Sequence, residues 1–100
     1  MIRHIIFLKL KNDAEGKSKA DNAVMLKQEL ESLVSKIKEI CRLEVGINYN
    51  TSQDAYDLAL VSDFNSKEDL EKYMKHPDHV RIGEIVKRVR ESRIVVDYEF

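Results

Sequence analysis

The stretch Ile2-Arg3-His4-Ile5-Ile6-Phe7-Leu8-Lys9-Leu10 decides the fold. Successive side chains of a strand point to opposite faces of a sheet. One alternation of this stretch carries Ile2, Ile6, Leu8 and Leu10, and the other carries Ile5 and Phe7. A strand with apolar groups on both faces is typical of the centre of a sheet covered on both sides. Tyr56–Phe64 has the same character, because Ala59 and Val61 stand opposite its other apolar side chains.

The remaining segments predict two further strands and three helical segments. Leu26, Leu30, Leu33, Ile37 and Ile40 form one helical stripe, so a helix is expected from a Ser18 cap to about Ile40. Arg42–Tyr49 and Arg93–Phe100 alternate as strands. A second helix is expected to begin after Ser66 and stop near Lys75, and another helical segment to run from Pro77 to about Arg90. Lys11–Lys19 is predicted to be a loop.

The resulting order is strand, helix, strand, strand, helix, strand. This is the ferredoxin-like βαββαβ plan, an α+β fold with a four-stranded antiparallel sheet. Its helices can cover only one face of the sheet, whereas the central strands are apolar on both. A second copy of the chain is the simplest cover, so the sequence predicts a homodimer that forms a dimeric α/β barrel. Four polar side chains on the outer strands leave two interpretations, a polar rim of the dimer or a partly hydrated face: Glu44, Asn48, Asp97 and Glu99.

Length and composition indicate a single domain over residues 1–100. The net charge is −1 with both signs interspersed, which argues against nucleic-acid binding. No uninterrupted apolar run exceeds four residues, so no membrane association is expected. The chain start lacks a signal-peptide layout and Cys41 is the lone cysteine, which favours a cytoplasmic location.

The segment Tyr73–Val80 is the candidate site, because it combines a phenol, two histidines and the chain's single proline. Pro77 should form a fixed corner between Tyr73 and His79. An imidazole can remove a proton next to a carbonyl, and a phenol can donate a hydrogen bond to the resulting oxyanion. The alternative is structural: Tyr73 lies in the core, and His79 binds a backbone group near the helix start. His4 is likewise either a core residue or part of a cavity shared with His79.

Other chemistry has weaker support in the sequence. His76, Asp78 and His79 could be metal ligands, but Pro77 disrupts helical ligand spacing, so neither a metal nor another cofactor is predicted. No phosphate-binding glycine loop or serine elbow is present. A basic run near the C-terminus is interpreted as a solvated helix face and its exit, with phosphate or carboxylate binding as the alternative: Lys87, Arg88, Arg90 and Arg93.

Five stretches resemble the stress-responsive A/B barrel domain (Dabb) family, and together they span essentially the whole chain: His4–Leu10, Val45–Asn48, Tyr56–Val61, Leu70–Val80 and Val96–Glu99. The Tyr-x-x-His-Pro-x-His segment is the most specific of them. The resemblance implies a ferredoxin-like fold that dimerises into a barrel, and it does not imply one activity.

In a plant polyketide cyclase of this family, the tyrosine and the second histidine of the matching segment form the catalytic pair. The resemblance therefore implies these roles for Tyr73 and His79, with His4 matching a first-strand histidine. A further pocket histidine of that cyclase aligns near Leu58, so this chain lacks it.

Three functional hypotheses follow. The first is a homodimeric A/B barrel protein that binds a small apolar or aromatic molecule near His4, Tyr73 and His79. The second is a cofactor-independent enzyme for carbonyl chemistry, with His79 as base and Tyr73 as oxyanion donor. The third is a purely structural dimer, in which side chains such as Met74, Ile85 and Val86 fill the space.

Overall fold

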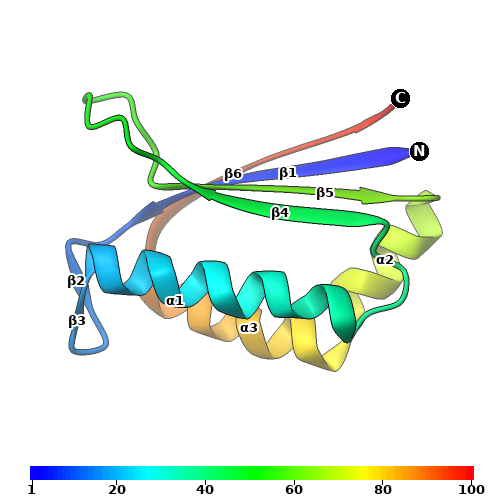
Figure 1. The fold of residues 1–100 in the computed structure, drawn as a ribbon, viewed down its shortest axis with the longest axis horizontal. Coiled ribbons are helices and arrows are strands. Elements are labelled where there is room, and N and C mark those ends of the chain that lie inside the picture. The colour runs from blue at the N-terminus through cyan, green and yellow to red at the C-terminus, as the bar shows by residue number, and fades with distance from the viewer.

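A four-stranded antiparallel sheet with helices on one of its faces makes up the fold (Figure 1). The computed structural model describes residues 1–100. The elements, in chain order, are β1 (Ile2–Leu10), β2 (Asp13–Ala14), β3 (Lys17–Ser18), α1 (Lys19–Glu31), the 3-10 helix η1 (Ser32–Ser35), β4 (Arg42–Ile47), β5 (Leu58–Phe64), α2 (Lys67–Lys75), α3 (Pro77–Val89) and β6 (Arg90–Glu99).

The strand order β4-β5-β1-β6 places the two doubly apolar strands at the centre, as predicted. Ile6 of β1 lies opposite Leu60 of β5 and Val95 of β6, and all the pairings in the main sheet are antiparallel. The predicted α+β ferredoxin-like class is confirmed. No helix combines the length and the apolar character that crossing a membrane requires.

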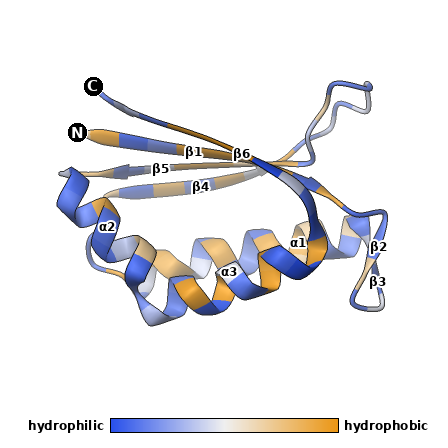
Figure 2. Ribbon diagram, turned by 180° about the vertical axis from the view of Figure 1, so that it is seen from behind, coloured by the Kyte–Doolittle hydropathy of each residue, from blue (hydrophilic) through white to orange (hydrophobic).

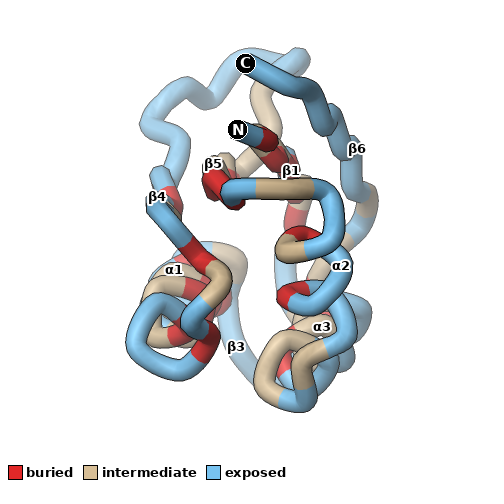
Figure 3. Tube along the Cα trace, turned by 90° about the vertical axis from the view of Figure 1, so that its right-hand side faces the viewer, coloured by how far each residue is buried: buried red, intermediate tan, exposed pale blue.

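The two faces of the sheet differ in their cover. Helices α1 and α3 lie against one face, as Figure 2 shows from behind and Figure 3 from the end of the sheet. The core between the layers takes the helix-facing side chains of the strands, among them Leu8, Val45 and Phe64. The opposite face has no cover within the chain, and exposed apolar side chains stand on its β1 and β6 strands and at the C-terminus: Phe7, Ile94, Val96, Tyr98 and Phe100.

The first helix is shorter than predicted. Ser18 caps it as expected, its Oγ accepting a hydrogen bond from the Asp21 N–H at 3.2 Å. However, α1 ends at Glu31 and gives way to η1, so the expected extension to Ile40 is wrong. The hydroxyls of Ser32 and Ser35 donate to backbone carbonyls three residues earlier, a local bond that competes with regular helix. The apolar stripe persists because Leu33, Ile37 and Ile40 remain buried.

Smaller differences appear at the other ends. The expected loop Lys11–Lys19 contains the short β2–β3 hairpin, whose turn places Glu15 and Gly16 at φ of 53° and 74°. Positive φ at both central residues matches the right-handed twist of the flanking strands. Strand β4 ends at Ile47 instead of Tyr49, and β5 begins at Leu58 instead of Tyr56. Strand β6 begins at Arg90 instead of Arg93.

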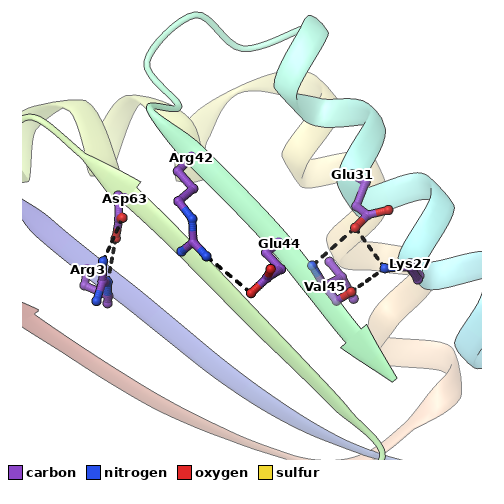
Figure 4. Close-up of polar contacts among 7 residues, drawn as sticks. All are labelled: Arg3, Lys27, Glu31, Arg42, Glu44, Val45 and Asp63. Atoms are coloured by element: carbon purple, nitrogen blue, oxygen red, sulfur yellow. Dashed lines mark hydrogen bonds and ion pairs between the residues drawn. The ribbon is translucent and has the colours of Figure 1, made fainter. Parts of the chain in front are cut away.

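Side chains of α1 protect the edge of β4 (Figure 4). The Nζ of Lys27 donates to the Val45 carbonyl at 2.5 Å, and Glu31 accepts from the Val45 N–H at 3.4 Å. Lys27 and Glu31 also pair with each other at 3.0 Å, one helical turn apart. An edge strand exposes unpaired backbone groups, and these two side chains satisfy those of Val45.

The uncovered face carries an ion pair among its apolar groups. Arg3 donates two hydrogen bonds to the Asp63 carboxylate, at 2.8 and 3.0 Å (Figure 4). These bonds from Arg3 lower the pKa of Asp63 below its ordinary value. Asp97 and Glu99, predicted to lie at a polar rim of the dimer or on a partly hydrated face, do not lie on the uncovered face. They project toward the helices, where Asp97 contacts His4 and Glu99 contacts Lys67, so they form no rim on the uncovered face.

Candidate functional site

The corner between α2 and α3 lies where the sequence predicted it. Helix α2 ends at Lys75, His76 adopts an extended conformation with φ −62° and ψ 136°, and α3 begins at Pro77. The Nδ1 atom of His76 accepts a hydrogen bond from the Asp78 N–H at 3.1 Å. His76 is thus the N-cap of α3, since its ring nitrogen satisfies one of the free N–H groups at the helix start.

The corner brings three predicted side chains into one aromatic cluster. The ring centroids of Tyr73 and His79 are 4.5 Å apart, and those of Tyr73 and His4 are 6.3 Å apart. Phe64 of β5 contacts the other side of the Tyr73 ring, with centroids 4.9 Å apart. Tyr73 therefore lies between the sheet and α3.

His79 is a neutral imidazole with one defined donor. Its Nδ1 lies 3.0 Å from the Met74 carbonyl oxygen. Because a carbonyl only accepts, Nδ1 carries the proton and Nε2 is left as an acceptor. Burial lowers the pKa of His79 below 6.5, and the positive charge of Arg93 acts in the same direction. At neutral pH this arrangement provides a free Nε2 lone pair.

The Tyr73 hydroxyl is buried and has no hydrogen-bond partner. Burial raises the pKa of Tyr73 well above 10, so the phenol keeps its proton throughout the physiological range. A buried hydroxyl without a partner is uncommon in folded proteins, because desolvation costs about 1–3 kcal/mol when no hydrogen bond replaces water. The group is an available donor.

The ring of His4 is held by Asp97, a residue predicted to lie at a polar rim of the dimer or on a hydrated face. Its Nδ1 lies 2.5 Å from Oδ1 of Asp97 on the neighbouring strand β6. The register places these residues directly opposite each other, so both side chains project toward the helices. The alternation of β6 was readable from the sequence, but the pairing with β1 that brings Asp97 to His4 was not.

An apolar cavity of about 250 Å³ lies between α1, α3 and the sheet. Its walls include Leu30 of α1, Ile82 and Val86 of α3, and Leu60 of β5. Of the three predicted site residues, only His79 lines this cavity; His4 and Tyr73 lie behind it in the aromatic cluster. In a purely structural dimer, side chains such as Met74, Ile85 and Val86 were expected to fill this space. Val86 instead lines the cavity, and Met74 is exposed.

Three cationic side chains line the same cavity: Lys87, Arg90 and Arg93. Arg90 and Arg93 are three residues apart and would face opposite sides of a regular strand. A bulge leaves Glu91 unpaired, so that Arg90 lies opposite Leu10 and Arg93 opposite Leu8, both on the helix-facing side. Of the basic run, Arg88 lies on the solvated helix face as predicted, where it pairs with Glu15.

The weak metal hypothesis gains no geometric support. His76 caps α3 and His79 binds the Met74 carbonyl, and no three His, Cys, Asp or Glu side chains converge as a potential ligand set.

Fold and site together define a ferredoxin-like domain with a pocket between its helices and its sheet. The chain belongs to the stress-responsive A/B barrel domain family, whose sequence profile matches residues 2–100.

A plant relative and two solved structures show the range of similarity. The chain is 31% identical over 98 residues to the stress-response A/B barrel domain-containing protein DABB1 of Arabidopsis thaliana, and the match covers 98% of the chain but 46% of that protein. The chain thus spans about half the length of this relative.

A dimeric ferredoxin-like protein of unknown function from Bacteroides fragilis shares 37% identity at a TM-score of 0.87, with 99% and 95% of the two chains covered. The hydroxynitrile lyase of Passiflora edulis superposes with a TM-score of 0.80 at 19% identity, with 97% and 90% covered, which shows a common fold.

Proposed function

We propose that this chain is a homodimeric A/B barrel protein that binds a small apolar or aromatic molecule in the cavity between α3 and the sheet. The cavity itself carries the proposal: about 250 Å³ of space, walled by aliphatic side chains and bordered by His79. Binding pockets are typically apolar with a few polar groups that orient the ligand. The volume lies just below the roughly 300 Å³ at which pockets for drug-sized molecules begin, so the ligand is small.

The uncovered face of the sheet supports the homodimer. Ile5 and Phe7 of β1 lie beside Val96 and Ile94 of β6 across the ladder, forming a continuous apolar surface. A patch of this kind on a single chain is characteristic of a protein–protein interface. The Bacteroides fragilis relative, at 37% identity, is a dimer of the same fold. Sheet-to-sheet contact between two copies would bury this surface.

A second candidate, an enzyme for carbonyl chemistry, is favoured by one observation. The unpartnered Tyr73 hydroxyl belongs to a ring 4.5 Å from the His79 ring, and His79 offers a free Nε2. His79 could remove a proton from the carbon next to a carbonyl while Tyr73 donates a hydrogen bond to the enolate oxygen. The Tyr73 hydroxyl is buried outside the cavity, so catalysis would require a rearrangement that simple ligand binding does not require. Ligand binding is therefore the first proposal.

Fragment screening by ¹H–¹⁵N NMR tests the binding function. Ligands in the cavity should shift the amide signals of Gly83 and Val86. Val86→Phe would fill the cavity and should weaken such ligands at least about tenfold, a loss of about 1.4 kcal/mol. Val80→Phe is the matched control, because Val80 lies on the same helix but is exposed. The proposal fails if no fragment shifts these signals, or if Val86→Phe leaves the affinity of every hit unchanged.

The enzymatic candidate needs a different readout. Ketone-bearing hits are incubated with the protein in D₂O, and exchange of the proton next to the carbonyl is followed by NMR. Catalysed exchange that disappears in His79→Gln and falls in Tyr73→Phe would support the enzyme. Exchange at the uncatalysed rate, with hits bound, would leave a binding protein.

A further inference from the structure

Arg90 and Arg93 of β6 differ from the basic side chains of α3 in their surroundings. Arg81 contacts Glu29 at 3.4 Å and Arg88 contacts Glu15 at 2.6 Å, so each has a carboxylate nearby. Lys87 reaches Glu84 at 3.5 Å, both largely exposed. The guanidinium groups of Arg90 and Arg93, in contrast, have no carboxylate within 4.0 Å and line the apolar cavity.

The β-bulge at Glu91 is what directs both arginines to one place. Without the extra residue, Arg90 and Arg93 would lie on opposite faces of β6, and one would project toward the uncovered face. With it, they stand beside Leu10 and Leu8 on the helix-facing side. Both side chains line the same cavity, so an anion bound there would be attracted by two positive charges.

We propose that the cavity is a site for an amphipathic anion, a small molecule with an apolar body and a carboxylate head. The aliphatic walls hold the body, and Arg90 and Arg93, assisted by Lys87, bind the head. This assignment rests on the proposed binding function and gives it a ligand class. Arginine suits the role because its planar fork donates two parallel hydrogen bonds to a carboxylate.

His79 is compatible with an anionic ligand because an imidazole carries no negative charge, and no Asp or Glu lines the cavity. The predicted cyclase-like roles do not require Arg90 or Arg93, so anion binding can be tested apart from them. The cavity volume of about 250 Å³ suits a medium-chain fatty acid or an alkyl-substituted aromatic acid, and is below the roughly 300 Å³ of pockets for larger ligands.

Matched acid and alcohol pairs provide the test. Octanoate is compared with 1-octanol, and 4-butylbenzoate with 4-butylbenzyl alcohol, by NMR titration of the full chain at pH 7 and low salt. Hydrogen bonds to charged groups are stronger than those between neutral groups, so each acid should bind about tenfold or more tightly than its alcohol. Added salt should weaken the acids more than the alcohols.

The variant R90Q/R93Q should bring the affinity of each acid down to that of its alcohol, while the alcohols bind as before. The control R81Q/K72Q removes the same amount of charge from side chains that do not line the cavity, and should leave the acids unaffected. Circular dichroism and the unchanged alcohol affinity show that R90Q/R93Q is folded.

The failures are distinguishable. Equal affinities of acids and alcohols, or acid binding that survives R90Q/R93Q, overturn the anion assignment and leave the binding function in place. If neither member of either pair, nor any fragment of the screen, shifts Gly83 or Val86, both proposals fall.

Discussion

Asp97 of β6 lies with its Oδ1 atom 2.5 Å from Nδ1 of His4 on β1, and this contact links the edge strand to a buried histidine that is 1% exposed. The carboxylate accepts a hydrogen bond from the Nδ1–H group, which fixes the orientation of the ring behind Tyr73. Removal of the acceptor would leave a buried N–H unsatisfied.

Asp97→Ala should therefore lower the free energy of unfolding by about 1–3 kcal/mol, measured by urea denaturation at pH 7. Asp97→Asn keeps an acceptor oxygen and should cost less. Glu99→Ala is the control, because the pair of Glu99 with Lys67 is exposed on both sides and such pairs contribute about 0–1 kcal/mol. A loss in Glu99→Ala as large as that in Asp97→Ala would contradict the role given to the buried histidine.

The second prediction concerns the homodimer. Val96→Glu places a charge in the middle of the uncovered face and should prevent two sheets from meeting, since an unpaired buried charge is strongly unfavourable. The wild type should sediment at twice the 11.7 kDa mass of the chain, and the variant at that mass. Val80→Glu is matched to it: the two valines are 48% and 49% exposed, but Val80 lies on α3. A wild-type monomer, or a dimer that survives Val96→Glu, would contradict the interface.

The third prediction concerns the pH dependence of stability through His79. Burial lowers the pKa of His79 below 6.5 in the folded chain, and unfolding restores the ordinary value. Between the two values the unfolded chain binds more protons, so this contribution to stability is complete above about pH 6.5 and is lost as the pH falls through the folded pKa.

His79→Gln should flatten this part of the stability profile, measured by urea denaturation from pH 7.5 to 4.5. His76→Asn serves as the control, since an asparagine also caps a helix and the wild-type slope should persist. A slope unchanged in His79→Gln would show that other groups cause it.

The fourth prediction uses the unpartnered hydroxyl of Tyr73. Tyr73→Phe removes a buried oxygen that makes no hydrogen bond, so the free energy of unfolding should stay equal or rise by up to about 1 kcal/mol. Tyr73→Ala empties the space between Phe64 and His79 and should cost about 3–5 kcal/mol. Thermal and urea unfolding measure both; a clear loss in Tyr73→Phe would show that the hydroxyl has a partner in solution.

The sequence by itself determined the architecture. The apolar groups on both alternations of β1 and β5 predicted a central position for both strands, and the element order predicted the ferredoxin-like plan. Pro77 predicted the corner between α2 and α3, because a proline restricts both itself and the residue before it. The largest error in element bounds was the end of α1, where an apolar stripe continues through turns that serine side chains stabilise.

The tertiary structure alone decided which side chains share a site. Asp97 reaches His4 through the register of β6 on β1, and the bulge at Glu91 brings Arg90 and Arg93 to the same face. Local sequence predicts the period of a strand, but register and bulges depend on the pairing of distant strands. For this reason the helix–sheet pocket could be expected from the chain, whereas its cationic border became visible only in the fold.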